Sequence, residues 1–560
     1  TQLFTPHWVV RYMVENSLGR IWMTLHPESP LIKEMPYYIP TPEGQTDTIP
    51  EDIKSAVDIR FLDPCMGSGH ILVYAFDLFT KMYEEEGYQT REIPALILTN
   101  NIFGIDIDRR CYQLASFALT MKARAYYSRY LRKAIQPNTI VLHNIDHDTI
   151  ASVGNLDANS SMWQFENVDT IGSLLQITAD DCNKIKIEDG LFGARQQLLK
   201  TQAKYLSKKY HCVVTNPPYL GKGMGDILKN YILVHFPNSK ADTMATFMER
   251  CLDLCTTKGR MAMINMQSWM FLASYEDLRI NLLENFQIET MLHLGPHAFD
   301  EIGGEVVQCA TFVMQRFKPV YSGLFYKLTE GNNCAAKEAD FINNKTSYYS
   351  VNQNNFEKIQ GSPITFGFNE KYYDCFSYPI MENYCLSNGQ NITGNNDKYL
   401  RLFWEVDMIH VSKNFWIFCA RGGGYRKYYG NVDNLILWTE NARNHYKKDK
   451  IARIISEDLR FKKGITWSYV CSGRPTFRVL HENELFEKAG TSVFLHDENL
   501  LIPLMGLLNS KVAAKLYHII QPSTKLQVRD MFLLPIADSA IKKTSLTKLI
   551  EKNISLYKQD

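Results

Sequence analysis

Short hydrophobic runs alternate with longer stretches of helical periodicity between residues 50 and about 320. The runs are rich in β-branched or other apolar residues and have the length of single strands, which indicates buried β-strands. One helix is especially clear, because apolar residues recur on one face over 71–82, directly after a glycine turn. Strands that alternate with helices in this way predict an α/β domain whose parallel strands are joined by crossover helices. The expected strands are 58–62, 102–105, 139–142, 212–215, 260–265 and 290–294.

The pattern changes after residue 328. Residues 329–356 are rich in Asn, Thr, Glu and Lys, a composition that is typical of a linker or a domain seam. Beyond this segment the chain is less regular and more aromatic, and a further helix is expected over 501–519. We therefore expect an α/β domain at 1–328, a linker at 329–356 and a C-terminal α+β domain at 357–560.

The composition is that of an ordinary folded protein. Of 560 residues, 45% are hydrophobic and 22% are charged, which excludes wholesale disorder and collagen-like architecture. No run approaches the ~20 consecutive apolar residues that cross a bilayer, and no secretory signal opens the chain, so we expect a cytoplasmic protein without membrane contact. The 12 cysteines are scattered without a CxxC array, so we expect reduced thiols and no metal site. Because the first residue is Thr1, we also expect a piece of a longer protein.

Positive charge is concentrated in one window of the chain. The whole chain has 61 basic and 60 acidic residues, yet residues 401–480 hold 15 basic and 7 acidic side chains, together with four of the eight tryptophans. Basic side chains interleaved with aromatic ones favour a phosphate-rich ligand with stackable bases. A solvated surface over an aromatic core explains the same pattern equally well. The residues that we single out as candidates for contact with such a ligand are Arg421, Arg426, Lys427 and Arg474.

A glycine-rich turn lies between the first expected strand and the clear helix. It reads DPCMGSG at residues 63–69. Glycines here let the backbone pass close to a ligand at the carboxyl edge of a parallel sheet. The helix N-terminus offers unpaired amide groups to an anion, while Asp63 could hold an ammonium group. The alternative is a merely tight connection, and the spacing differs from the GxGxxG pattern of dinucleotide-binding proteins.

An acidic side chain follows the next expected strand. The sequence GIDID at 104–108 places Asp106 directly after a buried run. A carboxylate at this point could accept hydrogen bonds from both hydroxyl groups of a ribose. The alternative interpretation is a helix cap, since Asp108 precedes a long helical pattern.

The most specific motif is Asn216-Pro217-Pro218-Tyr219, which follows another apolar strand. Two consecutive prolines remove two amide donors and stiffen the loop, so that the Asn216 side chain and the Pro217 carbonyl are fixed in space. Two oxygens placed on the hydrogens of a purine amino group favour the pyramidal form of the nitrogen, which is the form that can attack. Tyr219 would stack on the base. An ordinary turn is the alternative.

Together these motifs resemble a known family. The glycine-rich turn at 63–69 followed by Asn-Pro-Pro-Tyr is similar to the signature of the S-adenosylmethionine-dependent adenine-N6 DNA methyltransferases. The order of cofactor motif, catalytic motif and C-terminal target-recognition region resembles the gamma class, and TQLFTP at 1–6 is similar to the motif that opens its catalytic domain. Residues 242–247 and 259–265 are similar to later blocks of the class. Blocks at 361–363, 393–395, 423–424, 426–427, 464–468 and 508–510 look like the PglX-type methyltransferases of BREX phage-exclusion systems.

The resemblance implies a Rossmann-like methyltransferase domain followed by a target-recognition domain. It also implies S-adenosylmethionine as cofactor, S-adenosylhomocysteine as product, and no metal. For the cofactor it implies Thr5, Asp63, Pro64, Gly67 and Gly69 at the methionine end, Asp106 at the ribose, and Asn144 or alternatively Asp146 at the adenine. The catalytic roles that it implies belong to Asn216, Pro217, Pro218 and Tyr219.

We therefore expect a site-specific adenine-N6 DNA methyltransferase that acts on double-stranded DNA in phage defence, with other defence proteins as candidate partners. In this hypothesis duplex DNA docks between the α/β domain and the basic C-terminal region, and the target adenine rotates out beside Asn216. Two alternatives stay open: a methylase of RNA or of protein glutamine side chains, and a non-catalytic DNA-binding subunit of a defence complex. The recognised DNA sequence does not follow from the chain alone.

Overall fold

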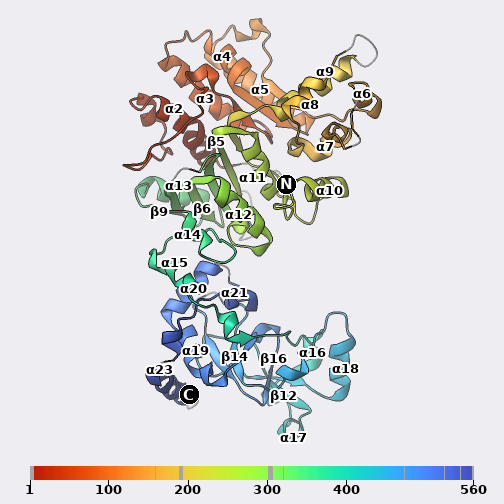
Figure 1. Cartoon of the computed structure of the whole chain (residues 1–560), viewed down its shortest axis with the longest axis vertical. Helices are drawn as coiled ribbons and strands as arrows, with labels where there is room; N and C mark the ends of the chain where they lie inside the picture. Colours follow the sequence, from red (N-terminus) through yellow and green to blue (C-terminus); the bar gives the residue numbers. More distant parts are fainter. Residues whose placement is uncertain are drawn as a thin grey trace. The chain divides into compact units, whose positions relative to one another are not determined.

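The computed structural model divides into two units, Thr1–Glu357 and Lys358–Asp560 (Figure 1). It describes residues 5–154, 156–157, 159–187, 193–299, 307–318, 321–471, 473–521, 524–542 and 544–557. Residues 1–4 of the opening motif lie outside the described residues.

A nine-stranded sheet organises the first unit, in the order β3-β2-β1-β4-β5-β7-β6-β8-β9. From β3 to β5 neighbouring strands are parallel, whereas β7 is antiparallel to both β5 and β6. Each strand expected from the sequence is present, within a few residues of the expected bounds. The strands are β1 Phe61–Asp63, β2 Ile102–Asp106, β3 Asn138–Val141, β4 Tyr210–Thr215, β5 Cys255–Met266, β6 Gln287–Gly295, β7 Cys309–Gln315, β8 Gly323–Lys327 and β9 Tyr349–Val351.

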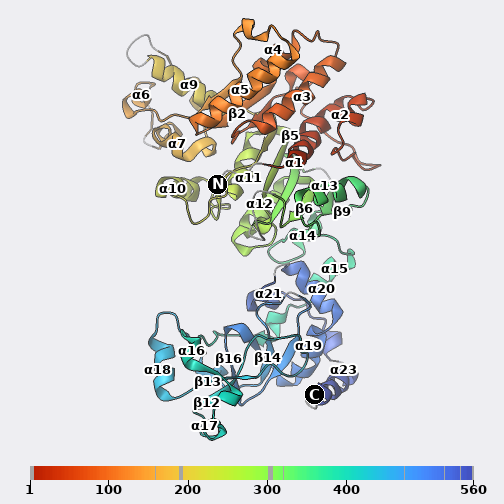
Figure 2. The same ribbon diagram turned by 180° about the vertical axis from the view of Figure 1, so that it is seen from behind.

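Helices cover both faces of this sheet (Figures 1 and 2). Successive strand side chains point to opposite faces. Val214 and Ile264 share one hydrophobic core with α1, α3 and α5, whereas Val213 and Met263 lie outside that core, on the face that α11 covers. The helices of this unit are α1 His7–Val14, α2 Arg20–Leu25, α3 His70–Glu85, α4 Ile93–Leu96, α5 Arg109–Tyr126, α6 His147–Ala151, α7 Val168–Ile171, α8 Ala179–Lys184, α9 Gly193–Ser207, α10 Asp226–His235, α11 Thr243–Leu254, α12 Glu276–Asn285, α13 Cys334–Asn343 and α14 Asn354–Glu357.

The strand order reverses between β1 and β4. The chain proceeds from β1 through β2 to β3 in one direction, and then from β4 to β5 in the other. In open parallel sheets, ligands bind beyond the carboxyl ends of the strands at this switch point. The glycine-rich turn at 63–69 follows β1, and the Asn-Pro-Pro-Tyr loop follows β4, so both motifs lie at the switch point.

The segment 329–356 is not a linker, which corrects the expectation from composition. It contains helix α13 and strand β9, and β9 pairs with β8 at the end of the large sheet. Phe341 of α13 is fully buried in the main core and stacks on Trp8. Lys337 is also buried and donates hydrogen bonds to the carbonyl oxygens of Leu294 and Leu328. A segment composition rich in Asn, Thr, Glu and Lys therefore concealed a docked helix.

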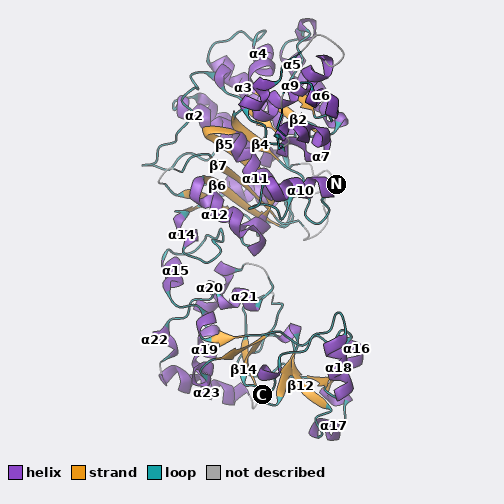
Figure 3. Ribbon diagram, turned by 45° about the vertical axis from the view of Figure 1, so that its right-hand side comes forward, coloured by secondary structure: helices purple, strands orange, loops and turns teal. Residues whose placement is uncertain are grey.

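Two four-stranded sheets and surrounding helices form the second unit, an α+β arrangement (Figure 3). One sheet has the order β10-β17-β14-β15 and the other β11-β13-β12-β16. The strands are β10 Cys385–Leu386, β11 Leu400–Leu402, β12 Trp416–Ala420, β13 Asn434–Leu437, β14 Gly464–Trp467, β15 Phe477–Leu480, β16 Glu484–Phe486 and β17 Ser492–Leu495. The helices are α15 Lys371–Asp374, α16 Asn396–Tyr399, α17 Met408–Ser412, α18 Glu440–Lys448, α19 Leu501–Leu508, α20 Lys511–Ile520, α21 Val528–Phe532, α22 Asp538–Ile541 and α23 Thr544–Tyr557.

The single helix expected over 501–519 is broken into α19 and α20, which meet at 82°. Asn509 causes the break by bonding to both the N–H and the carbonyl of Phe477. The hydroxyl of Ser510 then caps α20 by accepting from the amide of Ala513. Within the described residues, no individual helix has the length and hydrophobicity of a membrane span, and this bent pair meets that test only when its two helices are joined.

Candidate functional site

A buried hydrogen bond ties the two loops of the switch point together. The hydroxyl of Thr215, the last residue of β4, donates to Asp63 Oδ1 over 2.8 Å, and the Cys65 amide donates to the same oxygen over 3.1 Å. Among the described residues, Asp63 Oδ2 has no hydrogen-bond partner. The carboxylate therefore fixes the end of β1 against the end of β4 and keeps one oxygen for a donor on a ligand.

Burial makes Asp63 a weak acid. Its side chain is 1% exposed, and desolvation of the carboxylate raises the pKa of Asp63 to about 7, with a smaller contribution from the negative charge of Asp106. Burial also raises the pKa of Asp106. A cationic ligand beside these carboxylates would stabilise their ionised forms, so this end of the site suits an ammonium group.

The two glycines of the turn have different roles. Both have positive φ values, +51° at Gly67 and +86° at Gly69, which side-chain-bearing residues rarely adopt. A Cβ on Gly69 would lie 3.0 Å from the Cβ of Ala115, so this glycine permits α3 and α5 to pack. A Cβ on Gly67 would have no atom within 4 Å, so the space beside Gly67 is open to a ligand.

Asp106 joins the glycine turn to the end of β2. Its Oδ2 accepts from the Gly67 amide over 2.9 Å, and its Oδ1 accepts from the Asp108 amide over 2.8 Å. The Ile107 amide is a third backbone partner of this carboxylate, and a carboxylate has about four acceptor positions, so some capacity stays available for a diol. Asp108 has the separate role of capping α5, where it accepts from the Arg110 amide.

Asn144 lies on the loop after β3, next to the strand that carries Asp106. Leu142, at the start of this loop, donates its amide to the Asp106 carbonyl over 2.9 Å. The Asn144 side chain is exposed and accepts from the Asp169 amide over 2.9 Å. Asp146 caps α6 and pairs with Arg195. Of the two sequence candidates, Asp146 is thus engaged in holding a helix.

The second loop brings together residues that are 211 positions apart in the chain. Asn216 Nδ2 donates to the hydroxyl of Thr5 over 3.1 Å. The Tyr219 hydroxyl donates to Asn216 Oδ1 over 3.0 Å and to the Ile264 carbonyl over 3.3 Å. Burial raises the pKa of Tyr219, so its hydroxyl keeps its proton. These bonds orient the Asn216 amide.

Helix α11 also supports this loop. The hydroxyl of Thr243 donates to the Pro218 carbonyl over 2.6 Å and accepts from the Leu220 amide over 3.0 Å. Pro217 is buried, whereas Pro218 is exposed. The loop is therefore held at both ends, by Thr5 on one side and Thr243 on the other.

Two supporting residues escaped the sequence analysis. The hydroxyl of Ser173 donates to the Pro64 carbonyl over 2.7 Å, and the buried Arg250 donates to the Ser173 carbonyl over 3.0 Å. Arg250 also donates to the carbonyls of Leu175 and Leu206. The available signal was an arginine in α11, a helix whose other buried residues are uncharged.

The candidates for contact with a phosphate-rich ligand differ in availability. Arg421 is paired with Glu487 over 2.7 Å, and Lys427 donates to the Asn509 carbonyl over 3.0 Å. Arg426 and Arg474 are exposed, and neither forms an ion pair with a described residue. The first two thus hold the fold of the second unit, while the last two present charge to solvent.

The fold and the two linked loops define a class. A parallel sheet with a strand-order switch, an acidic glycine turn on one side and a fixed Asn-Pro-Pro-Tyr loop on the other is an S-adenosylmethionine-dependent methyltransferase fold. Similar folds are found in the Type IIL restriction-modification enzyme MmeI in complex with DNA (TM-score 0.55, 13% identity, 98% of this chain and 70% of that chain). The DrdV–DNA complex is also similar (TM-score 0.55, 10% identity, 99% and 57%).

Sequence relatives define the family more closely. Residues 100–299 match the Eco57I restriction-modification methylase family. The whole chain is 34% identical to the adenine-specific methyltransferase BrxX of Escherichia coli O9:H4 (strain HS) and 33% identical to the adenine-specific methyltransferase PglX of Lacticaseibacillus casei (strain Zhang). It spans about half the length of these curated relatives, 51% of each. Over its whole length the chain is therefore similar to about half of each of these two adenine-specific methyltransferases.

Proposed function

We propose that this protein transfers a methyl group from S-adenosylmethionine to the N6 amino group of adenine in duplex DNA. The observation that carries the proposal is the Asp63–Thr215 hydrogen bond, which fixes an acidic glycine turn directly beside Asn216. In a reaction with little acid–base chemistry, such positioning supplies most of the catalysis. Marking of host DNA in phage defence, with other defence proteins as partners, is the role that the sequence resemblance implies.

The residues at the switch point fit the cofactor. Asp63 Oδ2 is positioned to bind the ammonium of the methionine part, and the open space at Gly67 admits the ligand backbone. Asp106 has acceptor positions for the ribose hydroxyls, and Asn144 lies on the adjacent loop for the adenine. When bound, S-adenosylmethionine supplies a methyl group on a positively charged sulfur, which is already an activated leaving group.

The target adenine must leave the duplex to reach Asn216. Extrusion of a base costs a few kcal/mol. Stacking of the base on the ring of Tyr219 would return ~1–3 kcal/mol, by analogy with other aromatic platforms. Hydrogen bonds to the base edge offset the remainder. The bond from the Tyr219 hydroxyl to the Ile264 carbonyl holds the ring in place before the base arrives.

Asn216 and Pro217 then act on the amino group. The nitrogen of an adenine amino group is a poor nucleophile because its lone pair is delocalised into the ring. Asn216 Oδ1 and the Pro217 carbonyl can each accept one amino hydrogen, which favours a pyramidal nitrogen and stabilises the positive charge that develops on it. The bond from Asn216 Nδ2 to Thr5 keeps the amide oxygen turned toward the substrate.

Replacement of Asn216 tests the proposal. We expect Asn216→Ala to abolish transfer of tritiated methyl groups to duplex DNA while cofactor affinity, measured by calorimetry, changes little. Asn332→Ala, at an exposed position of the same unit, is the matched control and should behave like wild type. Wild-type rates in Asn216→Ala would overturn the assignment. Parallel assays with RNA and with protein acceptors distinguish the alternative substrates, since only duplex DNA should be methylated.

A further inference from the structure

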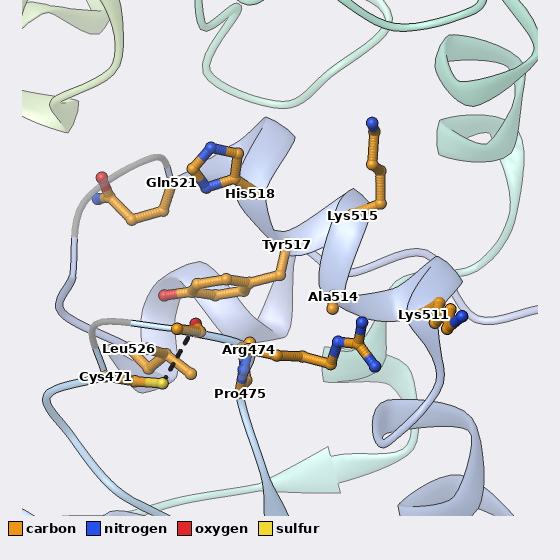
Figure 4. A pocket seen from close by; sticks show the side chains of 11 residues that line it. Cys471, Arg474, Pro475, Lys511, Ala514, Lys515, Tyr517, His518, Gln521 and Leu526 are labelled. Atoms are coloured by element: carbon orange, nitrogen blue, oxygen red, sulfur yellow. Dashed lines mark hydrogen bonds between the residues drawn. The ribbon is translucent and has the colours of Figure 1, made fainter. Parts of the chain in front are cut away.

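A pocket of about 270 Å³ in the second unit lies outside the site described above. It is bounded by the loop at 473–475, by one side of α20 and by Leu526, and the close view in Figure 4 shows its lining side chains. Pockets that take drug-sized molecules usually measure ~300–1,000 Å³, so this one has room for a smaller group. Its size suits a single phosphate group with some of its water.

The rim of the pocket is basic. Lys511, Lys515 and His518 recur at helical spacing along one side of α20, and Arg474 comes from the facing loop. In Figure 4 the guanidinium of Arg474 extends toward Lys511. No acidic side chain lines the pocket, and within the described residues neither lysine nor Arg474 forms a salt bridge. The rim therefore carries positive charge that the protein itself does not neutralise.

The helix adds to this positive potential. Lys511 is the first residue of α20, and the first turn holds no acidic residue. The N-terminus of a helix carries partial positive charge, so a lysine there is unfavourably placed unless an anion is near. An anion in the pocket would interact favourably with the helix terminus, Lys511 and Arg474 at once, whereas the Lys515 ammonium lies over the ring of Phe368.

The floor of the pocket is rigid and largely apolar. Tyr517 and Leu526 are buried, and the Tyr517 hydroxyl donates to the Lys525 carbonyl over 3.1 Å. Gln521 is buried as well and donates to Asp530 over 3.2 Å. A pocket with a charged rim and a fixed floor holds a ligand at the surface and does not enclose it. A long polymer can be bound only in this way, because the rest of the polymer must stay outside the pocket.

We propose that this pocket binds a phosphodiester group of the DNA backbone. The inference rests on the proposed function, because it takes DNA as the substrate. Arg474 belongs to the basic window at 401–480, while Lys511 and Lys515 extend that charge beyond it. Such contacts position the duplex and carry no sequence information. The pocket is therefore an anchoring site, and residues elsewhere must read the bases.

The salt dependence of DNA binding tests this assignment without knowledge of the target sequence. In the full chain, Arg474→Gln combined with Lys511→Gln removes two charges from the rim. The matched control combines Lys548→Gln with Lys552→Gln, two exposed positions on α23. Binding to a fluorescent duplex of mixed sequence is measured by anisotropy at several salt concentrations. Loss of one phosphate contact should reduce the slope of log K against log salt by ~0.9, which corresponds to about eightfold weaker binding near ~0.1 M salt.

We expect the smaller salt slope and the weaker binding in the rim variant only. A variant that carries Lys511→Arg alone keeps the charge and should show the wild-type slope. Equal losses of DNA affinity in the rim and control variants, or no loss in either, would overturn the assignment of the pocket. The proposed function would stay intact, provided that wild type binds and methylates DNA. If wild type fails to bind DNA, the proposed function itself is wrong. A calorimetric titration with inorganic phosphate separates the two sources of the group: saturation that DNA cannot displace would assign the pocket to a free anion and overturn the DNA contact.

Discussion

Asp63 should make cofactor binding dependent on pH. Its burial raises the pKa of the free carboxyl to about 7, whereas a bound ammonium favours the ionised form. With that pKa, about one carboxyl in eleven is ionised at pH ~6, and about ten in eleven at pH ~8. Cofactor affinity should therefore fall about tenfold between pH ~8 and ~6, equivalent to ~1.4 kcal/mol.

Asp63→Asn removes this titration while keeping most of the local structure. Thr215 and the Cys65 amide donate to Oδ1, which an asparagine oxygen can replace. The variant loses a charge-assisted hydrogen bond, which is worth ~1.5–3 kcal/mol, so its cofactor affinity at pH ~8 should be about 10- to 150-fold weaker. Because the variant has no carboxyl at this position, its cofactor affinity should not fall further between pH ~8 and pH ~6 through this side chain.

Calorimetry in two buffers of different ionisation enthalpy measures the protons released on binding. Wild type should release nearly one proton from Asp63 per cofactor at pH ~6 and about 0.1 at pH ~8. The α-amino group of the cofactor titrates near pH ~8 in both proteins, so the difference between wild type and Asp63→Asn isolates the carboxyl. Asp277→Asn, at an exposed position on α12, is the control. Equal proton release in wild type and Asp63→Asn would refute the role of Asp63.

Three further outcomes follow from the same contacts. Tyr219→Phe loses the hydrogen bond to Asn216, which is worth ~1 kcal/mol, and should lower kcat about fivefold. Tyr219→Ala also loses the stacking surface and should lower kcat further. Equal rates in the two variants would exclude a stacking role. Thr5→Val removes the hydrogen bond from Asn216 Nδ2 and should lower kcat several-fold, with Thr5→Ser restoring it; a change in KM alone would contradict a positioning role. Because the pKa of Asp63 lies above its unfolded value of ~3.9, the native state binds more protons between pH ~4 and about 7. The contribution of Asp63 to the unfolding free energy should thus decrease as pH rises through this range, and thermal unfolding of Asp63→Asn without cofactor should lack this component.

The sequence was sufficient to predict the central strands and the strand ends that carry the two motifs. Strands buried on both faces read as continuous apolar runs, and each motif follows such a run, so their carboxyl ends converge once the sheet forms. The pairing of Thr5 with Asn216 could be expected only from family resemblance, because no local pattern connects residues so distant in the chain.

The parts that escaped prediction depend on tertiary contacts. The segment around α13 resembled a linker because it is rich in Asn, Thr, Glu and Lys, and Phe341, which packs into the main core, is the single aromatic residue of the helix. The break after α19 arises from a bond between Asn509 and a distant strand, which helical periodicity cannot show. Arg421 and Lys427 looked available for DNA, yet their partners lie more than sixty residues away.

One covalent link connects the two halves of the proposed chemistry. Thr215, which donates to Asp63, is directly followed by Asn216 in the chain. The group that would hold the cofactor and the group that would hold the adenine are therefore separated by one hydrogen bond and one peptide unit. A shift of about 1 Å between reacting groups can cost ~10²-fold in rate. Such a short and buried connection leaves little room for that shift, so under the proposed function these loops would accelerate the transfer by holding the two groups in place.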